Sequence, residues 1–118
     1  MRHRLVAALL LVLLSGAACG QRVDPARLEA ARLKRAEELI RAGNESYRSG
    51  DYRLAARRYA AAAVVRKNDP AAYFGMGMAL SKLGRDEEAR VAYAKARELV
   101  LKEKREQEAR GAAAPVAP

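Results

Sequence analysis

The sequence predicts an all-α fold in which four helices form two repeated hairpins, and three observations support this prediction. Alanine and leucine supply most of the apolar residues, and these residues cost least to place in a helix. Phe occurs once and Trp is absent, whereas a sheet favours aromatic and β-branched side chains. Finally, the chain repeats its pattern of small and aromatic residues at an offset of 34 positions, which is the spacing of a helical-hairpin unit.

The repetition rests on matched residues that keep the same internal spacing. Such a run at one offset is unexpected in a random Ala-rich chain. A unit of this length accommodates two helices of about four turns each, joined by short turns. The matched pairs are Gly43 with Gly77, Gly50 with Gly84, Ala55 with Ala89, Tyr59 with Tyr93, Ala62 with Ala96, and Val65 with Leu99.

Local signals place the helix ends. Asp24-Pro25 and Asp69-Pro70 each combine an N-cap residue with a proline at the first helical position. Gly50 and Gly84 fall where helices end, and glycine adopts the left-handed conformation found there without steric cost. We therefore expect helices over about residues 25–49, 52–67, 70–83 and 86–109.

The repeated residues also have expected packing roles. Small residues at Gly43, Ala55, Gly77 and Ala89 let antiparallel helices approach towards the lower end of the usual separation of about 8–10 Å. The two repeated tyrosines are expected to fill the space beside such close crossings. The repeat-packing set is Gly43, Ala55, Tyr59, Ala62, Gly77, Ala89, Tyr93 and Ala96.

These residues and their spacing resemble the tetratricopeptide repeat family over residues 36–69 and 70–103. In that family a small residue lies midway along the first helix, an Ala opens the second, and an aromatic and another small residue follow. In this chain Lys67 occupies the place of the proline that often ends a unit, and Pro70 instead begins the next unit. The resemblance implies a fragment of an α-solenoid that binds proteins and carries out no catalysis.

The resemblance further implies a concave partner-binding face lined by the first helix of each unit. Arg48 and Lys82 would attract acidic side chains or a carboxylate of an extended peptide or helix. Alternatively, Ile40, Phe74 and Met78 belong to the core. Relatives that clamp a carboxylate have a lysine where Ile40 stands, so that specific function is not implied. The candidate residues are Ile40, Asn44, Tyr47, Arg48, Phe74, Met78, Ser81 and Lys82.

The expected domain spans residues 25–110, and its charged extensions, residues 25–35 and 102–110, are typical of polar caps on a repeat stack. Residues 111–118 are expected to form a disordered tail. Two repeats fall below the roughly three that such arrays usually need. Either the extensions supply the missing burial, or a partner or second copy completes the core. Leu99-Val100-Leu101 is the candidate exposed run for a homodimer, which would make the chain a self-associating structural envelope protein.

Residues 1–18 are typical of a secretory signal peptide. Arg2 and Arg4 precede ten apolar residues and then a small-residue cleavage region, residues 15–18. The apolar run is shorter than the roughly 20 residues needed to span a bilayer. Cys19 is the only cysteine, and Ser15-Gly16-Ala17-Ala18-Cys19 resembles the bacterial lipoprotein signal, which implies lipidation of Cys19. The alternatives are a secreted protein with a free thiol and an uncleaved anchor.

An acylated Cys19 would tether the domain to a lipid membrane through residues 19–24, and more than one acyl chain makes such anchoring stable. The resemblance to lipoproteins implies that Gly20, where Asp would favour the inner membrane, directs the protein to the outer membrane of an organism that has one. The expected protein is thus a periplasm-facing scaffold or assembly factor of the cell envelope, with protein partners of unknown identity.

Charge and reactive side chains exclude several function classes. The net charge is +9, but acidic and basic residues alternate along the chain and no nucleic-acid motif accompanies them, so anionic lipid is favoured over nucleic acid. His3, the single histidine, lies in the expected signal peptide. Nucleophilic triads and metal sites of the His or Cys type are therefore excluded from the expected mature chain. The sequence predicts no enzyme, no cofactor and no metal.

Overall fold

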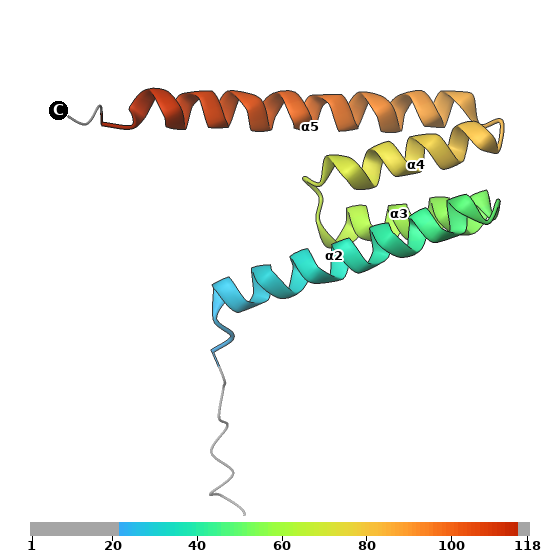
Figure 1. Ribbon diagram of the computed structural model, residues 1–118, viewed down its shortest axis with the longest axis horizontal. Coiled ribbons are helices and arrows are strands. Elements are labelled where there is room, and N and C mark those ends of the chain that lie inside the picture. Colours follow the sequence, from blue (N-terminus) through green and yellow to red (C-terminus); the bar gives the residue numbers. More distant parts are fainter. Residues whose placement is uncertain (1–21, 116–118) are drawn as a thin grey trace, which may run out of the picture.

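The computed structural model describes residues 22–115, which form four α-helices and confirm the all-α, helical-hairpin fold class (Figure 1). The helices are α2 (Pro25–Arg48), α3 (Tyr52–Val65), α4 (Pro70–Lys82) and α5 (Asp86–Ala113). The expected signal peptide, Cys19 and the last three residues lie outside the described part of the chain.

Two helix ends differ from the expected positions by more than one residue. Helix α3 ends at Val65 because Arg66 adopts an extended conformation, with φ of −132°, that leads into the turn before α4. Helix α5 continues to Ala113, so the first residues of the expected disordered tail are helical. Alanine is the best helix former, and the alanines after Gly111 favour this extra turn.

Aspartate side chains cap three of the four helices. Asp24 accepts a hydrogen bond from the Ala26 amide, and Asp69 accepts one from the Ala71 amide, both at 3.0 Å. Asp51 likewise caps α3. These bonds satisfy amides that have no partner within the helix. Helix α5 lacks such a cap but begins with three acidic residues, which the helix dipole favours at that end.

Consecutive helices pack side by side to form a single stack. Helix α2 packs on α3, α3 on α4 and α4 on α5, while α2 also touches α4 (Figure 1). The two turns between paired helices contain Gly50 and Gly84, whose φ values of 82° and 73° match the left-handed conformation that the sequence predicts. The first turns of α2 and the last turns of α5 project beyond the stack (Figure 1).

Two tyrosine rings separate the helices where they approach one another. The ring of Tyr59 on α3 lies against Gly43 on α2 and against Gly75 on α4, and it is only 1% exposed. A Cβ added at Gly43 would lie 2.8 Å from the Tyr59 ring, closer than real contacts allow. The glycines therefore make room for the ring, in addition to letting helix backbones approach.

The second repeat has a similar contact on one side only. The ring of Tyr93 on α5 lies against Gly77 on α4, where an added Cβ would again be 2.8 Å from the ring. Alanines fill most of the remaining core, together with Leu80 and Leu99. The prediction of an exposed run at residues 99–101 is wrong for Leu99, which is 3% exposed, whereas Val100 and Leu101 are 51% and 55% exposed.

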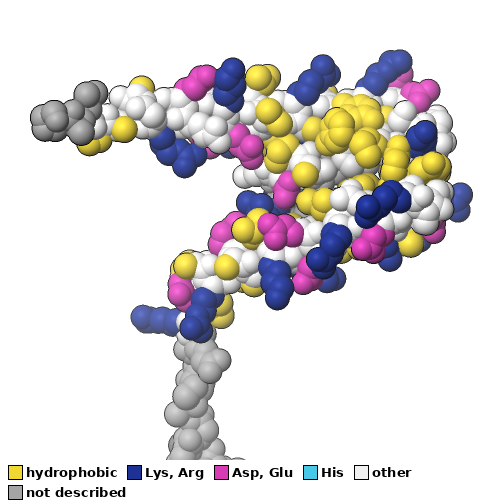
Figure 2. Space-filling view, viewed as in Figure 1, with side chains coloured by type: hydrophobic (Ala, Val, Ile, Leu, Met, Phe, Trp, Pro, Cys, Tyr) yellow, Lys and Arg dark blue, Asp and Glu magenta, His cyan; other side chains and the backbone are white. Residues whose placement is uncertain are grey.

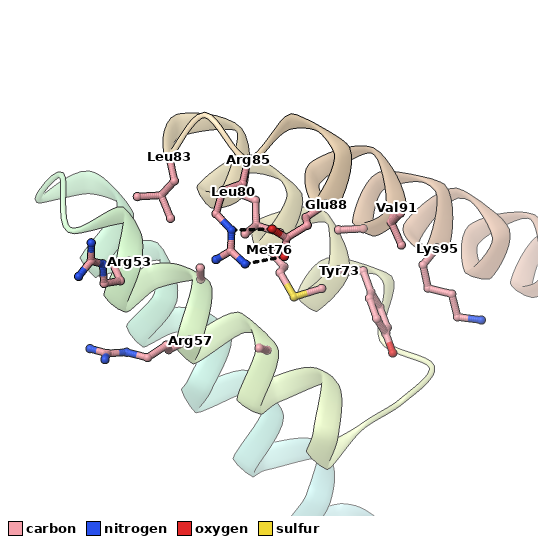
Figure 3. Close-up of a pocket in the computed structure, with 13 residues that line it drawn as sticks. Arg53, Arg57, Tyr73, Met76, Leu80, Leu83, Arg85, Glu88, Val91 and Lys95 are labelled. Carbon is pink, nitrogen blue, oxygen red and sulfur yellow. Dashed lines mark hydrogen bonds and ion pairs between the residues drawn. The ribbon is translucent and has the colours of Figure 1, made fainter.

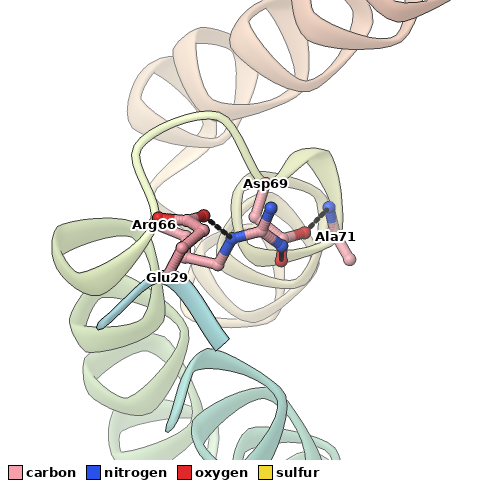
Figure 4. A network of polar contacts seen from close by, with 4 residues as sticks. All are labelled: Glu29, Arg66, Asp69 and Ala71. Atoms are coloured by element: carbon pink, nitrogen blue, oxygen red, sulfur yellow. Dashed lines mark hydrogen bonds and ion pairs between the residues drawn. The ribbon is translucent and has the colours of Figure 1, made fainter. Parts of the chain in front are cut away.

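Polar side chains join the helices at their edges. Arg58 on α3 donates hydrogen bonds to the Ala42 carbonyl oxygen at 2.8 Å and to the buried Ser46 hydroxyl at 2.7 Å, both on α2. Arg66 lies between Glu29 of α2, at 3.8 Å, and Asp69, at 3.5 Å, which also caps α4 (Figure 4). Arg66 thus links the first helix to the turn between the two hairpins.

The projecting part of α5 is polar and exposed. Residues 102–113 are all exposed, and Lys102–Glu106 and Lys104–Glu108 form ion pairs of 3.9 Å one helical turn apart. Basic and acidic side chains are interspersed along this arm, whereas hydrophobic side chains gather over α4 and the adjoining turns of α5 (Figure 2). Within residues 22–115, no helix combines the length and the apolar character required to cross a bilayer.

Candidate protein-binding surfaces

Four residues at one end of the expected concave face lie close together. Tyr47, near the end of α2, makes an edge-to-face contact with Tyr52 at the start of α3, with ring centroids 5.1 Å apart. Lys82, at the end of α4, lies 6.0 Å from the centroid of the Tyr52 ring, within cation–π range. Arg48 is exposed beside Tyr47. The sequence analysis named Tyr47, Arg48 and Lys82 but missed Tyr52, which opens the second helix.

Asn44 and Ile40 are engaged with the core. The Tyr59 hydroxyl donates a hydrogen bond to the Asn44 side-chain oxygen at 2.6 Å, so this oxygen already has a partner. Burial raises the pKa of the Tyr59 phenol above its usual value, the nearby Tyr47 raises it further, and Arg48 lowers it. Ile40 is half-buried and packs against two core clusters. Its contacts agree with the alternative that it is a core residue.

The remaining candidates of the concave face lie along α4. Phe74 is 54% exposed and its ring lies 5.5 Å from that of Tyr93, while Met78 is half-buried. Ser81 is exposed. Phe74 therefore contacts α5 and lines the end of the stack, whereas Lys82 lies beside the Tyr47–Tyr52 pair.

A cleft of about 620 Å³ lies between α3 and α5, with α4 as its floor (Figure 3). The floor is apolar and is formed chiefly by Tyr73, Met76 and Leu80. Because successive helical residues turn by about 100°, these positions lie on the side of α4 opposite Phe74, Met78 and Ser81. The cleft is therefore on the face of the stack away from the expected concave surface.

Basic side chains surround this cleft. Arg53 and Arg57, one turn apart on α3, are exposed and form no ion pair within the described residues. On the α5 side, Arg85 is paired with Glu88, with Nε to Oε1 at 2.7 Å (Figure 3). Lys95 is paired with Glu98 at 2.9 Å. The unpaired arginines give the α3 wall a net positive charge.

The sequence pattern does not predict this cleft. Arg53 and Arg57 are four residues apart and so share a helix face, and Val91, which is 71% exposed, lies across the cleft on α5. The spacing of the two arginines is visible in the sequence. Their position opposite α5 is not, because it depends on how far the second hairpin is rotated against the first.

No group of three or more His, Cys, Asp or Glu side chains suited to a metal ion occurs within residues 22–115. The surfaces that the described residues offer are instead apolar patches with charged edges. Comparisons of the chain with protein-family models, with curated proteins and with solved structures found no match.

Proposed function

We propose that this protein is a membrane-tethered, protein-binding module of the tetratricopeptide type, acting as a scaffold or assembly factor at a bacterial cell envelope. The observation that carries the proposal is the α3–α5 cleft, whose apolar floor is flanked by the unpaired Arg53 and Arg57. A surface of this kind suits an amphipathic protein segment with apolar residues on one side and carboxylates on the other.

The two parts of the cleft have different roles in this proposal. Burial of the apolar floor, including Met76, supplies affinity because apolar area leaves water. Methionine is flexible and adapts to partners of differing shape. The arginines raise the association rate of acidic partners and disfavour basic ones, and this contribution weakens as salt screens the charges.

Crosslinking from inside the cleft tests the proposal. A photoreactive phenylalanine analogue replaces Val91, which lines the cleft, or Val64, which is similarly exposed elsewhere on α3. We expect irradiation in membranes to join a discrete protein to the Val91 variant only, and the adduct to disappear when Arg53 and Arg57 are both changed to Glu. Identical adducts from positions 91 and 64, or none from 91, would contradict the cleft as the binding site.

The Tyr47–Tyr52–Lys82 group is a second candidate contact for a protein partner. It combines two aromatic rings with a cation, and aromatic and Arg side chains are enriched where proteins bind one another. Combined substitution of Tyr47, Arg48 and Lys82 by Ala should abolish capture of the partner while the circular dichroism spectrum is retained. An unchanged set of co-purified proteins would exclude this group as a contact.

We also propose that acylation of Cys19 anchors the module. The proposal rests on the signal-like residues 1–18 and the single cysteine that follows them. The Cys19→Ser variant should move from the membrane to the soluble fraction, and mass spectrometry of the parent chain should show a lipid-modified residue 19. A parent chain of unmodified mass in the soluble fraction would contradict the anchor and leave the binding proposal untouched.

A further inference from the structure

The second repeat ends in an apolar face that has no helix against it. This open face is formed by α4 and α5 around a hollow of about 780 Å³. The residues that line it include Ala71, Phe74, Tyr93, Arg97, Val100 and Leu101.

The first repeat shows what covers the same face. Tyr59 corresponds to Tyr93, and α4 closes over Tyr59 by placing Gly75 directly against the ring. Helix α4 makes this approach with Ala72, Gly75 and Ala79, all of which are buried. The covering element is thus a helix with small residues at positions i, i+3 and i+7.

No segment of the described chain provides such a helix for Tyr93. A further hairpin would need a turn near residue 104, but α5 continues without interruption to Ala113 and leads away from the stack (Figure 1). The open face therefore remains uncovered by the residues that the structure describes.

A second copy stacked head to tail does not suit the open face. The residues of α2 that correspond to Gly75 and Ala79 of α4 are Arg41 and Glu45, and both are exposed. Arg41 would meet the Tyr93 ring where a glycine is required. The two ends of the stack are consequently not complementary to each other.

The charge of the open face sets a further requirement for the covering helix. Arg97 occupies the position that Ala63 holds in the first repeat, where Ala63 is buried beside Ala72 and Tyr73. Arg97 is exposed and forms no ion pair within residues 22–115. A covering helix would therefore need a carboxylate at the position equivalent to Tyr73.

We infer that the open face binds a helix of another protein, with Gly or Ala at positions i, i+3 and i+7 and a carboxylate facing Arg97. This helix takes the place that α4 takes against Tyr59. The inference concerns a different surface from the α3–α5 cleft, so either contact can fail without the other.

A synthetic peptide tests the inference. The probe is the α4 sequence, residues 70–82, with Tyr73 replaced by Glu and with a hydrocarbon staple joining positions 77 and 81 on the outer side of the helix. Fluorescence anisotropy measures its binding to the Cys19→Ser chain without residues 1–18. We expect saturable binding that weakens at least about tenfold for Val100→Glu and stays unchanged for Val64→Glu, a matched exposed valine.

Two changes to the probe sharpen the test. A probe with Leu in place of Gly75 should lose at least about tenfold in affinity, because the leucine collides with Tyr93. Arg97→Glu should weaken binding of the acidic probe and restore it for a probe with Lys at position 73. Equal binding to Val100→Glu and parent, or no saturable binding, would overturn the inference. A dimer in sedimentation velocity that Val100→Glu dissociates would also overturn it, by assigning the face to a second copy.

Discussion

Two tyrosines at equivalent positions have different surroundings, and this difference is measurable. The Tyr59 hydroxyl donates a 2.6 Å hydrogen bond to Asn44, whereas the residue equivalent to Asn44 in the second repeat is Met78, which offers Tyr93 no such oxygen. Tyr59→Phe should lower the free energy of unfolding by about 0.5–1.5 kcal/mol, and Tyr93→Phe should leave it nearly unchanged. Urea denaturation followed by circular dichroism measures both, and equal losses would contradict the contact.

The Tyr59 phenol should also make the stability of the folded chain depend on pH. Burial raises the pKa of Tyr59 in the folded chain above the unfolded value. The neutral, buried phenol of Tyr59 therefore contributes its full stabilisation below the unfolded pKa of about 10. This contribution is lost as pH rises through the folded pKa. Urea midpoints between pH 8 and 11 should fall more steeply for the parent than for Tyr59→Phe. Parallel curves for the two chains would show that the phenol does not titrate differently on folding.

Among the described glycines, Gly75 has the least room for a side chain. A side chain at this position would overlap the Tyr59 ring, which α2 already holds on its other side. Gly75→Val should therefore lower the free energy of unfolding by about 1–3 kcal/mol. Gly111→Val, a helical position with open space around it, should change it by no more than about 0.5 kcal/mol. Similar losses for both would show that the Tyr59 ring is not the cause, because helix propensity alone favours valine over glycine.

The sequence predicted part of this packing. The offset comparison found Gly43, Gly77 and both tyrosines, because these residues repeat. It assigned no partner to Gly75, since the equivalent residue of the first repeat is Arg41. Gly75 packs between the two repeats, whereas the equivalent residue, Arg41, lies at the free end of the first repeat and has no such neighbour. Comparing the sequence with itself therefore does not detect this contact.

At the scale of elements, three of the four helices start at an aspartate cap that is recognisable in the sequence. The Asp51 side chain accepts a hydrogen bond from the Leu54 amide at 3.0 Å at the start of α3. Asp51→Ala should lower the free energy of unfolding by about 0.5–2 kcal/mol, while Asp51→Asn, which keeps an oxygen acceptor, should cost much less. Chemical denaturation of the two variants measures the difference, and equal costs would exclude the cap as the cause.

The projecting arm of α5 should contribute little to folding. Its residues from 104 to 113 are all exposed, and ion pairs of the Lys104–Glu108 kind add only about 0.3–0.5 kcal/mol each. A chain truncated after Glu103 should lose helical signal in proportion to the residues removed while its urea midpoint stays nearly constant. A large fall in the midpoint would mean that the arm supplies burial that two repeats otherwise lack.

At the scale of the whole molecule, four helices and their order could be predicted, but the binding surfaces could not. The number of helices follows from the 34-residue repeat and from the capping residues, and both are visible in the sequence. The α3–α5 cleft depends on how one hairpin rotates against the next. The Tyr59 ring lies between Gly43 and Gly75 where the two hairpins meet, and residue spacing does not encode how it fits there.

The two ends of the stack differ in chemistry, and this asymmetry underlies the proposed roles of the molecule. The α2 end presents charged residues such as Arg41 and Glu45, whereas the α4–α5 end presents Phe74 and Val100. Exposed apolar groups with charged neighbours are typical of surfaces that bind other proteins. A polar end near the expected tether and an apolar end away from it suit a module that holds a partner at a membrane.

Tyr59 is sealed between the two hairpins, whereas the equivalent Tyr93 is covered on one side only. The most direct test compares the unfolding free energies of Tyr59→Ala and Tyr93→Ala by urea denaturation. Tyr59→Ala should cost about 3–5 kcal/mol, as expected for a fully buried aromatic ring, and Tyr93→Ala clearly less. Equal costs would show that both rings are enclosed alike, and the open face and the partner assigned to it would then have no basis.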